Sequence, residues 1–212
     1  MPNVPHTSTV AAQAKEMAAA LHERQVAFLA DLVSIRSYTG QEKAAVERTL
    51  QELSEIGCDE VHVDSAGNAL GRIGHGPRVI LYNAHLDTNE VADESEWPHP
   101  PLQPVIENGA LWGLGASDCK GGVASIVYGA AILKALKLDS DFTLWVMGAT
   151  LEEDAEGFAL RSLVERDRLR PDVVLLAEAT DLSLRRGQRG RCEVRVRTTG
   201  KAAHASTPHL GD

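Results

Sequence analysis

Residues 78–87 read RVILYNAHLD, an apolar run that ends in a histidine and an aspartate. The run follows Gly76-Pro77, and its first six residues are almost continuously apolar, which is typical of a strand buried on both faces of a sheet. His85 and Asp87 are two residues apart, so on extended backbone we expect their side chains to point the same way. This stretch therefore predicts a central strand with polar side chains at its carboxyl end.

The regions on either side of this stretch predict an α/β fold. Two further apolar runs have the same character, at residues 142–148 (FTLWVMG) and 173–177 (VVLLA). A shorter strand pair is expected at 60–63 and 68–73. Helical periodicity or composition is found at residues 11–35, 41–56, 121–136 and 155–166. Strands that alternate with helices indicate a sheet that is at least partly parallel.

Two regions have a different character. Residues 88–110 contain four prolines, which predicts a long irregular connection. After Asp181 the pattern changes, and residues 182–187 and 192–199 are expected to form strands. Residues 185–201 carry six Arg and one Lys against one Glu, although the whole chain has a net charge of −9. These arginines either attract a substrate carboxylate or form the solvated face of a strand, and we favour the second interpretation for most of them.

Composition excludes several classes of protein. The 212 residues are 43% apolar and 24% charged, as in ordinary globular proteins. The net negative charge argues against a nucleic-acid partner. Polar and charged residues interrupt every apolar segment near the N-terminus, so we expect no membrane partner and a cytoplasmic location. Three scattered cysteines favour neither a zinc finger nor a disulfide framework.

Groups of polar side chains follow three of the expected strands, and a fourth group, at residues 117–122, comes just before the helix expected at 121–136. Ligands in open α/β sheets bind beyond the carboxyl ends of the strands, so we expect these groups to converge. Each has an ordinary alternative: a solvated turn, a helix cap at Asp118, an acidic helix start after residue 150, or a turn cap at Glu178. Cys119 is interpreted as a small buried residue. The candidate ligands are His85, Asp87, Asp118, Glu152, Glu153 and Glu178.

Taken together, these groups predict a metal site. Imidazole with several carboxylates suits zinc, manganese or cobalt. A bridging carboxylate would permit two cations about 3.5–4 Å apart. The clustering at four expected sheet ends favours this interpretation over four unrelated turns and caps.

The chain resembles the M20 family of metallopeptidases and deacylases from about residue 20 to its end. The resemblance rests on five segments in family order. They are HLD (85–87), GLGASDCKGG (113–122), TLEEDAEG (150–157), LLAEATD (175–181) and RGQRGRCEVRVRTTGKAAHASTPHLG (186–211).

For the fold, the resemblance implies a three-layer zinc-peptidase-like α/β sheet with helices on both faces. Residues 1–184 would be the N-terminal portion of a catalytic metal-binding domain. Residues 185–212 would begin an α+β ferredoxin-like lid domain, through which the full-length protein would form a homodimer. We expect the chain to be C-terminally truncated, because the family's final metal-binding histidine comes after the lid. His209 is not assumed to replace it. The 212 residues alone are expected to load the second metal weakly and to turn over poorly.

For the metal site, the resemblance implies two divalent cations, Zn²⁺ or alternatively Co²⁺ or Mn²⁺. His85 and Glu178 would bind one cation, Glu153 would bind the other, and Asp118 would bridge both. These assignments follow from matching motif positions, residue by residue.

For the reaction, the resemblance implies hydrolysis of amide bonds in small peptides or N-acyl amino acids by a metal-activated water. Asp87 would orient His85, Glu152 would be the general base, and His204 from the lid would steady the oxyanion. The alternative is an inactive fragment or a non-catalytic metal-binding module of the same fold. The motif set does not favour another metallohydrolase such as a phosphatase.

Overall fold

The computed structural model describes residues 7–138, 141–155, 157–187, 189–192 and 194–212. The chain divides into two compact units, Met1–Ala179 and Thr180–Asp212. Every helix of eight or more residues and every strand in the described part of the chain lies in the first unit.

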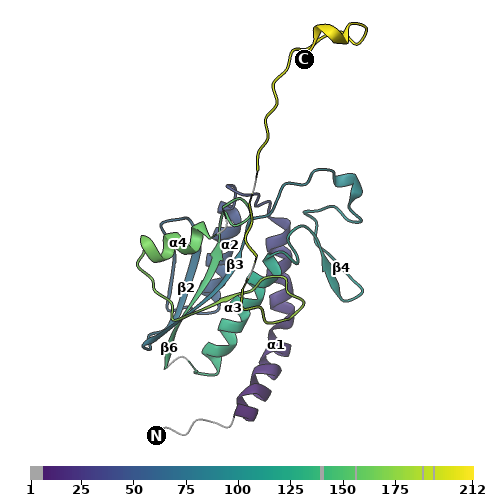
Figure 1. Ribbon diagram of the computed structural model, residues 1–212. Coiled ribbons are helices and arrows are strands. Elements are labelled where there is room, and N and C mark those ends of the chain that lie inside the picture. The colour runs from purple at the N-terminus through teal and green to yellow at the C-terminus, as the bar shows by residue number, and fades with distance from the viewer. Residues whose placement is uncertain (1–6, 139–140, 156, 188, 193) are drawn as a thin grey trace. The chain divides into compact units, whose positions relative to one another are not determined.

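A five-stranded mixed sheet forms the middle of the first unit (Figure 1). Its order is β1-β2-β6-β3-β7. β6 and β7 run parallel to β3, whereas β1 and β2 form an antiparallel edge. The strands are β1 (Glu60–Val63), β2 (Ala69–Gly74), β3 (Arg78–His85), β6 (Phe142–Ala149) and β7 (Val173–Leu176).

Helices cover both faces of this sheet, as the sequence predicts. On one face lie α1 (Thr7–Ser34), α2 (Lys43–Glu55) and α3 (Lys120–Ala135). On the other face lies α4 (Phe158–Glu165), which buries Ala159 and Leu163 against Leu81 and Met147. The three-layer α/β fold is therefore confirmed, and each predicted helix and strand of this unit is present within a few residues of its expected bounds.

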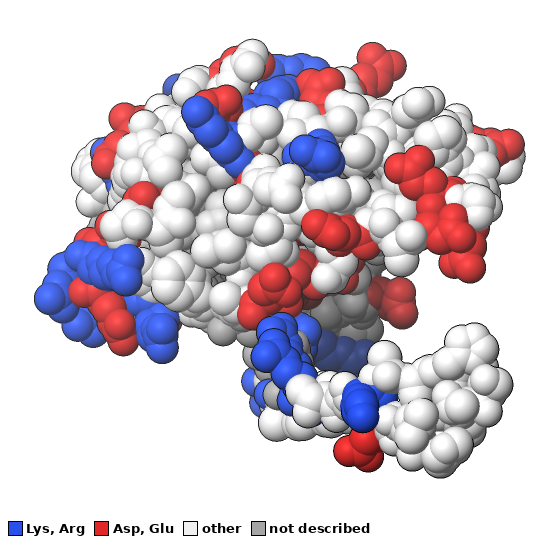
Figure 2. Space-filling view, turned by 90° about the horizontal axis from the view of Figure 1, so that it is seen from above, with Lys and Arg blue, Asp and Glu red and all other residues white. Residues whose placement is uncertain are grey.

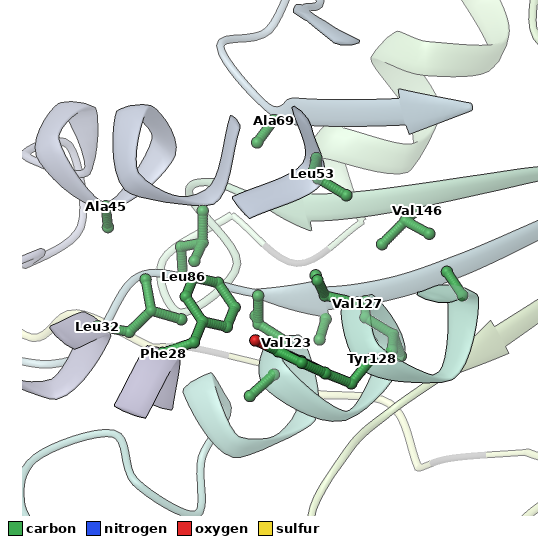
Figure 3. Close-up of a cluster of buried hydrophobic side chains, with 14 of the residues drawn as sticks. Phe28, Leu32, Ala45, Leu53, Ala69, Leu86, Val123, Val127, Tyr128 and Val146 are labelled. Atoms are coloured by element: carbon green, nitrogen blue, oxygen red, sulfur yellow. The ribbon is translucent and has the colours of Figure 1, made fainter. Parts of the chain in front are cut away.

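Figure 3 shows the larger of the two apolar clusters, between the sheet and α1–α3. Phe28 and Leu32 from α1 meet Val123 and Val127 from α3, and Leu86 lies beside them just after β3. Leu86 and the side chains around it are almost completely buried. This packing fixes the carboxyl end of β3, where the candidate ligands begin.

The prediction that residues 173–177 form a buried strand is wrong in one respect. β7 forms, but it lies at the end of the sheet, where only β3 pairs with it. Its four residues are exposed, from 43% at Leu175 to 56% at Val173. An apolar run indicates that a strand tends to be buried. It does not specify which residues pack against the strand.

The connection at 88–110 is also less irregular than predicted. It contains a short 3₁₀ turn, Glu94–Glu96, and a hairpin of β4 (Val105–Glu107) and β5 (Ala110–Trp112). Asn108 and Gly109 both have positive φ, at 52° and 77°. Asn-Gly is the preferred pair for the two-residue turn that joins hairpin strands, so the local sequence contained this signal.

The strands expected at 182–187 and 192–199 are absent from the described residues of the second unit, and Glu193 lies outside that description. Leu182, Leu184, Val194 and Val196 are exposed there. A strand needs a neighbour to satisfy its backbone groups, and an alternating pattern alone does not supply one. Within this unit Lys201 and Asp212 exchange backbone hydrogen bonds of 3.1 Å, and Pro208–Leu210 forms a 3₁₀ turn.

Candidate metal centre

Four side chains from three places in the sequence meet at the carboxyl end of the sheet. His85 is the last residue of β3, Asp118 and Cys119 precede α3, and Glu178 follows β7. One ligand atom from each lies within 4.8 Å of all the others. The Nε2 atom of His85 is 3.0 Å from Asp118 Oδ1. The structure thus brings together three of the four predicted metal ligands.

The ring of His85 is held by Asp87, although not mainly by its carboxylate. His85 Nδ1 is 2.9 Å from the backbone carbonyl oxygen of Asp87 and 3.5 Å from its Oδ1 atom. When Nδ1 donates its hydrogen to this carbonyl oxygen, the other ring nitrogen, Nε2, faces Asp118. The expected orienting function of Asp87 therefore has a structural counterpart, with the main-chain oxygen in the closer position.

Electrostatics at this site favour a cation. Burial lowers the pKa of His85, but hydrogen bonds with Asp87 and Asp118 and the nearby charge of Glu178 outweigh this effect and raise the pKa to about 10. Negative charge that holds a proton on a buried imidazole would equally hold a metal ion there. The donor set, one imidazole and several carboxylates, fits a divalent cation such as zinc.

Glu152 and Glu153 lie in the turn after β6. Glu152 Oε2 is 3.9 Å from His85 Nε2, and its side chain is about one-third exposed. Burial raises the pKa of both glutamates; the charge of His85 opposes the rise, and nearby carboxylates add to it. α4 begins only at Phe158, so the alternative that these acids start a helix is not what the structure shows. Glu156 lies outside the described residues.

Neither Asp118 nor Cys119 caps α3 with its side chain. The N-cap of α3 is Cys119, and no side chain caps the helix. The Asp118 side chain instead points to His85 and is 63% exposed. Cys119 is fully buried, and its Sγ donates to the Ala177 carbonyl oxygen at 2.8 Å. Burial, with help from Glu178 and Asp118, raises the pKa of this thiol, and the burial and hydrogen bond of Cys119 agree with its interpretation as a small buried residue.

Lys120 connects the segment that carries Asp118 to the end of α1. Its side chain is fully buried, and Nζ donates to the carbonyl oxygens of Leu32 and Ile35 at 2.8 and 2.9 Å. Burial lowers the pKa of this amine to about 8. These bonds tie the start of α3 to the end of α1, and so fix the chain that carries Asp118.

His204 belongs to the second unit and is not among the four clustered residues. Its Nδ1 accepts a hydrogen bond from the Ser206 backbone N–H at 3.2 Å and is 2.8 Å from Ser206 Oγ. The side chain is exposed. Its predicted function at the oxyanion therefore stays a prediction.

Close packing at Gly122 predicts a sharp effect of substitution on stability. A Cβ at this position would overlap the Ala177 carbonyl oxygen and lie 2.8 Å from Cys119 Sγ. Gly122→Ala is expected to lower the free energy of unfolding by about 1–3 kcal/mol, the usual cost of overpacking, measured by urea denaturation. Gly129→Ala on the same helix is the control, because nothing lies within 4 Å of its Cβ. That variant should be neutral or stabilising by about 0.5–1 kcal/mol, and equal destabilisation of both variants would contradict the prediction.

No helix among the described residues is long and apolar enough to cross a membrane. All three cysteines are free, with Cys119 buried and Cys192 exposed. Acidic side chains lie in several groups on the face shown in Figure 2, as expected from the net charge of −9.

The fold and the site define an α/β protein with a candidate divalent-metal centre at the carboxyl end of its sheet. The sequence-family model for peptidase family M20/M25/M40 matches residues 81–210. The chain belongs to this family, so the resemblance seen in the sequence is confirmed.

The similar proteins show how much of a family member is present. The Escherichia coli K12 protein named "Uncharacterized protein YgeY" is 40% identical over 185 residues, which cover 87% of this chain and 46% of that protein. A Staphylococcus epidermidis RP62A protein named "Probable succinyl-diaminopimelate desuccinylase" is 30% identical over 192 residues, which cover 88% and 47%. The chain spans about half the length of these curated relatives.

A solved structure supports the fold. Bacillus subtilis YXEP, described as a dinuclear metal binding peptidase from the M20 family, superposes with a TM-score of 0.57 at 19% identity. The match covers 74% of this chain and 43% of that one.

Proposed function

We propose that the protein containing this chain is a metal-dependent hydrolase of amide bonds in small peptides or N-acyl amino acids. The observation that carries the proposal is the cluster of His85, Asp118 and Glu178, with Glu152 3.9 Å from His85. Membership of the M20/M25/M40 family and the desuccinylase name of one relative support this reaction class.

The proposed cofactors are two divalent cations, Zn²⁺ or alternatively Co²⁺ or Mn²⁺. His85 and Glu178 would hold one cation, Glu153 would hold the other, and Asp118 would bridge them. Two features support this assignment: the meeting of His85, Asp118 and Glu178 in one cluster, and the description of the B. subtilis structure as dinuclear. When bound, the cations would supply Lewis-acid polarisation of the substrate carbonyl and of a water molecule.

Side chains of the protein would carry out the proton transfers. Glu152 lies beside the cluster, and its pKa is raised by burial and by neighbouring carboxylates, which suits a group that accepts and returns a proton. Glu152 would take a proton from the attacking water and deliver it to the leaving amine. Asp87 would keep His85 in one orientation through Nδ1.

The second unit would belong largely to a lid domain. We place residues 1–184 in the catalytic domain and regard residues 185–212 as the beginning of a lid domain. Through this lid the whole protein would form a homodimer and bring His204 to the oxyanion. We also propose a cytoplasmic location.

A substrate panel with metal removal tests the proposal. The whole protein is assayed with dipeptides, an N-acetyl and an N-succinyl amino acid, and a phosphate ester, before and after chelation. We expect hydrolysis of at least one amide, loss of that hydrolysis on chelation, and its return with Zn²⁺, Co²⁺ or Mn²⁺. Hydrolysis of the phosphate ester alone would contradict the proposal. A metal-loaded whole protein inactive on every amide would favour a non-catalytic module instead.

A further inference from the structure

The turn that carries Glu152 and Glu153 is held by buried side chains from outside it. Four successive backbone N–H groups, from Thr150 to Glu153, each donate to a side-chain oxygen. Thr150 N donates to Asn68 Oδ1 at 2.8 Å and Leu151 N to Glu42 Oε1 at 3.0 Å. The next two donate to the two carboxylate oxygens of Asp87, each at 3.1 Å. The backbone of this turn is thus fixed residue by residue.

Glu42 is the least expected member of this set. It is 5% exposed and lies at the N-cap of α2, yet its side chain does not cap that helix. Its Oε1 atom instead accepts from Gly40 N and Leu151 N, both at 3.0 Å. A buried carboxylate with two amide donors is a strong acceptor in a fixed place. It joins the start of α2 to a turn more than 100 residues later in the chain.

The Leu151 bond is at the point where the chain bends. Leu151 has a φ of 60°, in the left-handed region that side chains other than glycine seldom adopt. β6 ends at Ala149, and the Leu151 conformation belongs to the turn that carries Glu152 and Glu153. A backbone held in a sparsely populated region persists only where its surroundings determine it, and the Glu42 acceptor is part of those surroundings.

We propose that Glu42 is a positioning residue. Through its hydrogen bond to the Leu151 amide, it fixes the positions of the Glu152 and Glu153 carboxylates. Its consequence for catalysis rests on the proposed function, whereas its effect on the turn does not. Without this acceptor the Leu151 amide would be left without its partner, and the turn would sample other conformations. The two glutamates would then spend less time at the distances that the site requires.

The same helix offers a matched control. Glu52 is also on α2 and is 2% exposed, but its oxygens accept from Arg48 Nη2 at 2.8 Å and Tyr128 Oη at 2.6 Å. It makes no hydrogen bond to the 150–153 turn. Glu52→Gln therefore perturbs a buried carboxylate of α2 without touching the positioning contact.

The test compares Glu42→Ala, Glu42→Gln and Glu52→Gln in the metal-free chain and in the metal-loaded enzyme. The first measurement is amide hydrogen exchange at residues 150–153, followed by NMR and referenced to the global unfolding rate. We expect Glu42→Ala to speed this exchange about tenfold or more. Glu42→Gln keeps an acceptor oxygen and should remain near wild type, as should Glu52→Gln. If Glu42→Ala does not fold, Glu42→Asp withdraws the oxygen by one methylene and is read in the same way.

The second measurement is kinetic. Glu42→Ala should lower kcat at least about tenfold with KM changed less than twofold, and Glu42→Gln should restore most of kcat. Unchanged exchange at 150–153 in Glu42→Ala, or equal changes in Glu52→Gln, would overturn the positioning role. An enzyme that hydrolyses no amide would defeat the proposed function, while the exchange data would still decide the role of Glu42.

Discussion

Glu152→Gln is expected to lower kcat for amide hydrolysis by about 10²–10⁴-fold, the usual contribution of a positioned general base. The amide side chain fills the same space but cannot accept and return a proton. The bound metal should be retained, because the clustered ligands are His85, Asp118 and Glu178. The measurement is steady-state hydrolysis of the best substrate together with metal content by elemental analysis.

Asp154→Asn is the control for this experiment. Asp154 is an exposed carboxylate two residues further along the same turn, so the variant removes the same charge nearby without removing the proposed base. It should keep near wild-type activity. A Glu152→Gln protein that retained more than a tenth of the wild-type kcat would contradict the assignment of the base.

His85→Ala is expected to weaken Zn²⁺ binding by more than about 100-fold, since loss of even an outer-shell partner of a metal ligand typically costs 10–100-fold. His85 is buried and supplies the nitrogen donor of the cluster. Its loss would leave exposed carboxylates, which hold zinc less tightly by themselves. The affinity is measured by competition with a chromophoric chelator.

The control histidine is His62, on the edge strand β1. His62 lies on β1, 3.3 Å from Glu60, and packs edge-on against Trp145. His62→Ala removes one imidazole near a carboxylate but none from the cluster, so Zn²⁺ affinity should be unchanged. Equal losses in both variants would mean that zinc binds diffusely to acidic surface rather than at this centre.

Much of the fold could be predicted because its signals are local. The apolar run at 78–83, with His85 and Asp87 two residues apart after it, follows strand periodicity, and helices alternate with strands from α3 to β7. The β4–β5 hairpin was missed because four prolines outweighed the Asn108-Gly109 signal. The exposure of β7 could not be predicted, because burial depends on what packs against a strand and not on the strand's own residues.

The meeting of the candidate ligands could be predicted from the sequence, whereas the contacts that support them could not. His85 and Glu178 lie at strand ends and Asp118 lies just before α3, and the topology of an α/β sheet brings such positions together. Glu42 and Asn68 contact the 150–153 turn across more than 80 residues of sequence. Glu42 reads in the sequence as an ordinary acidic residue at the start of a helix. Which backbone group a buried oxygen accepts from is set by tertiary packing, so no local pattern reveals it.

The most direct test of the metal centre is anomalous diffraction at the zinc absorption edge, from crystals of the chain grown with Zn²⁺. We predict an anomalous peak within bonding distance, about 2.0–2.2 Å, of His85 Nε2 and of oxygens from Asp118 and Glu178. Absence of a peak at these three side chains in a zinc-saturated crystal, or zinc found only elsewhere on the chain, would contradict the assignment.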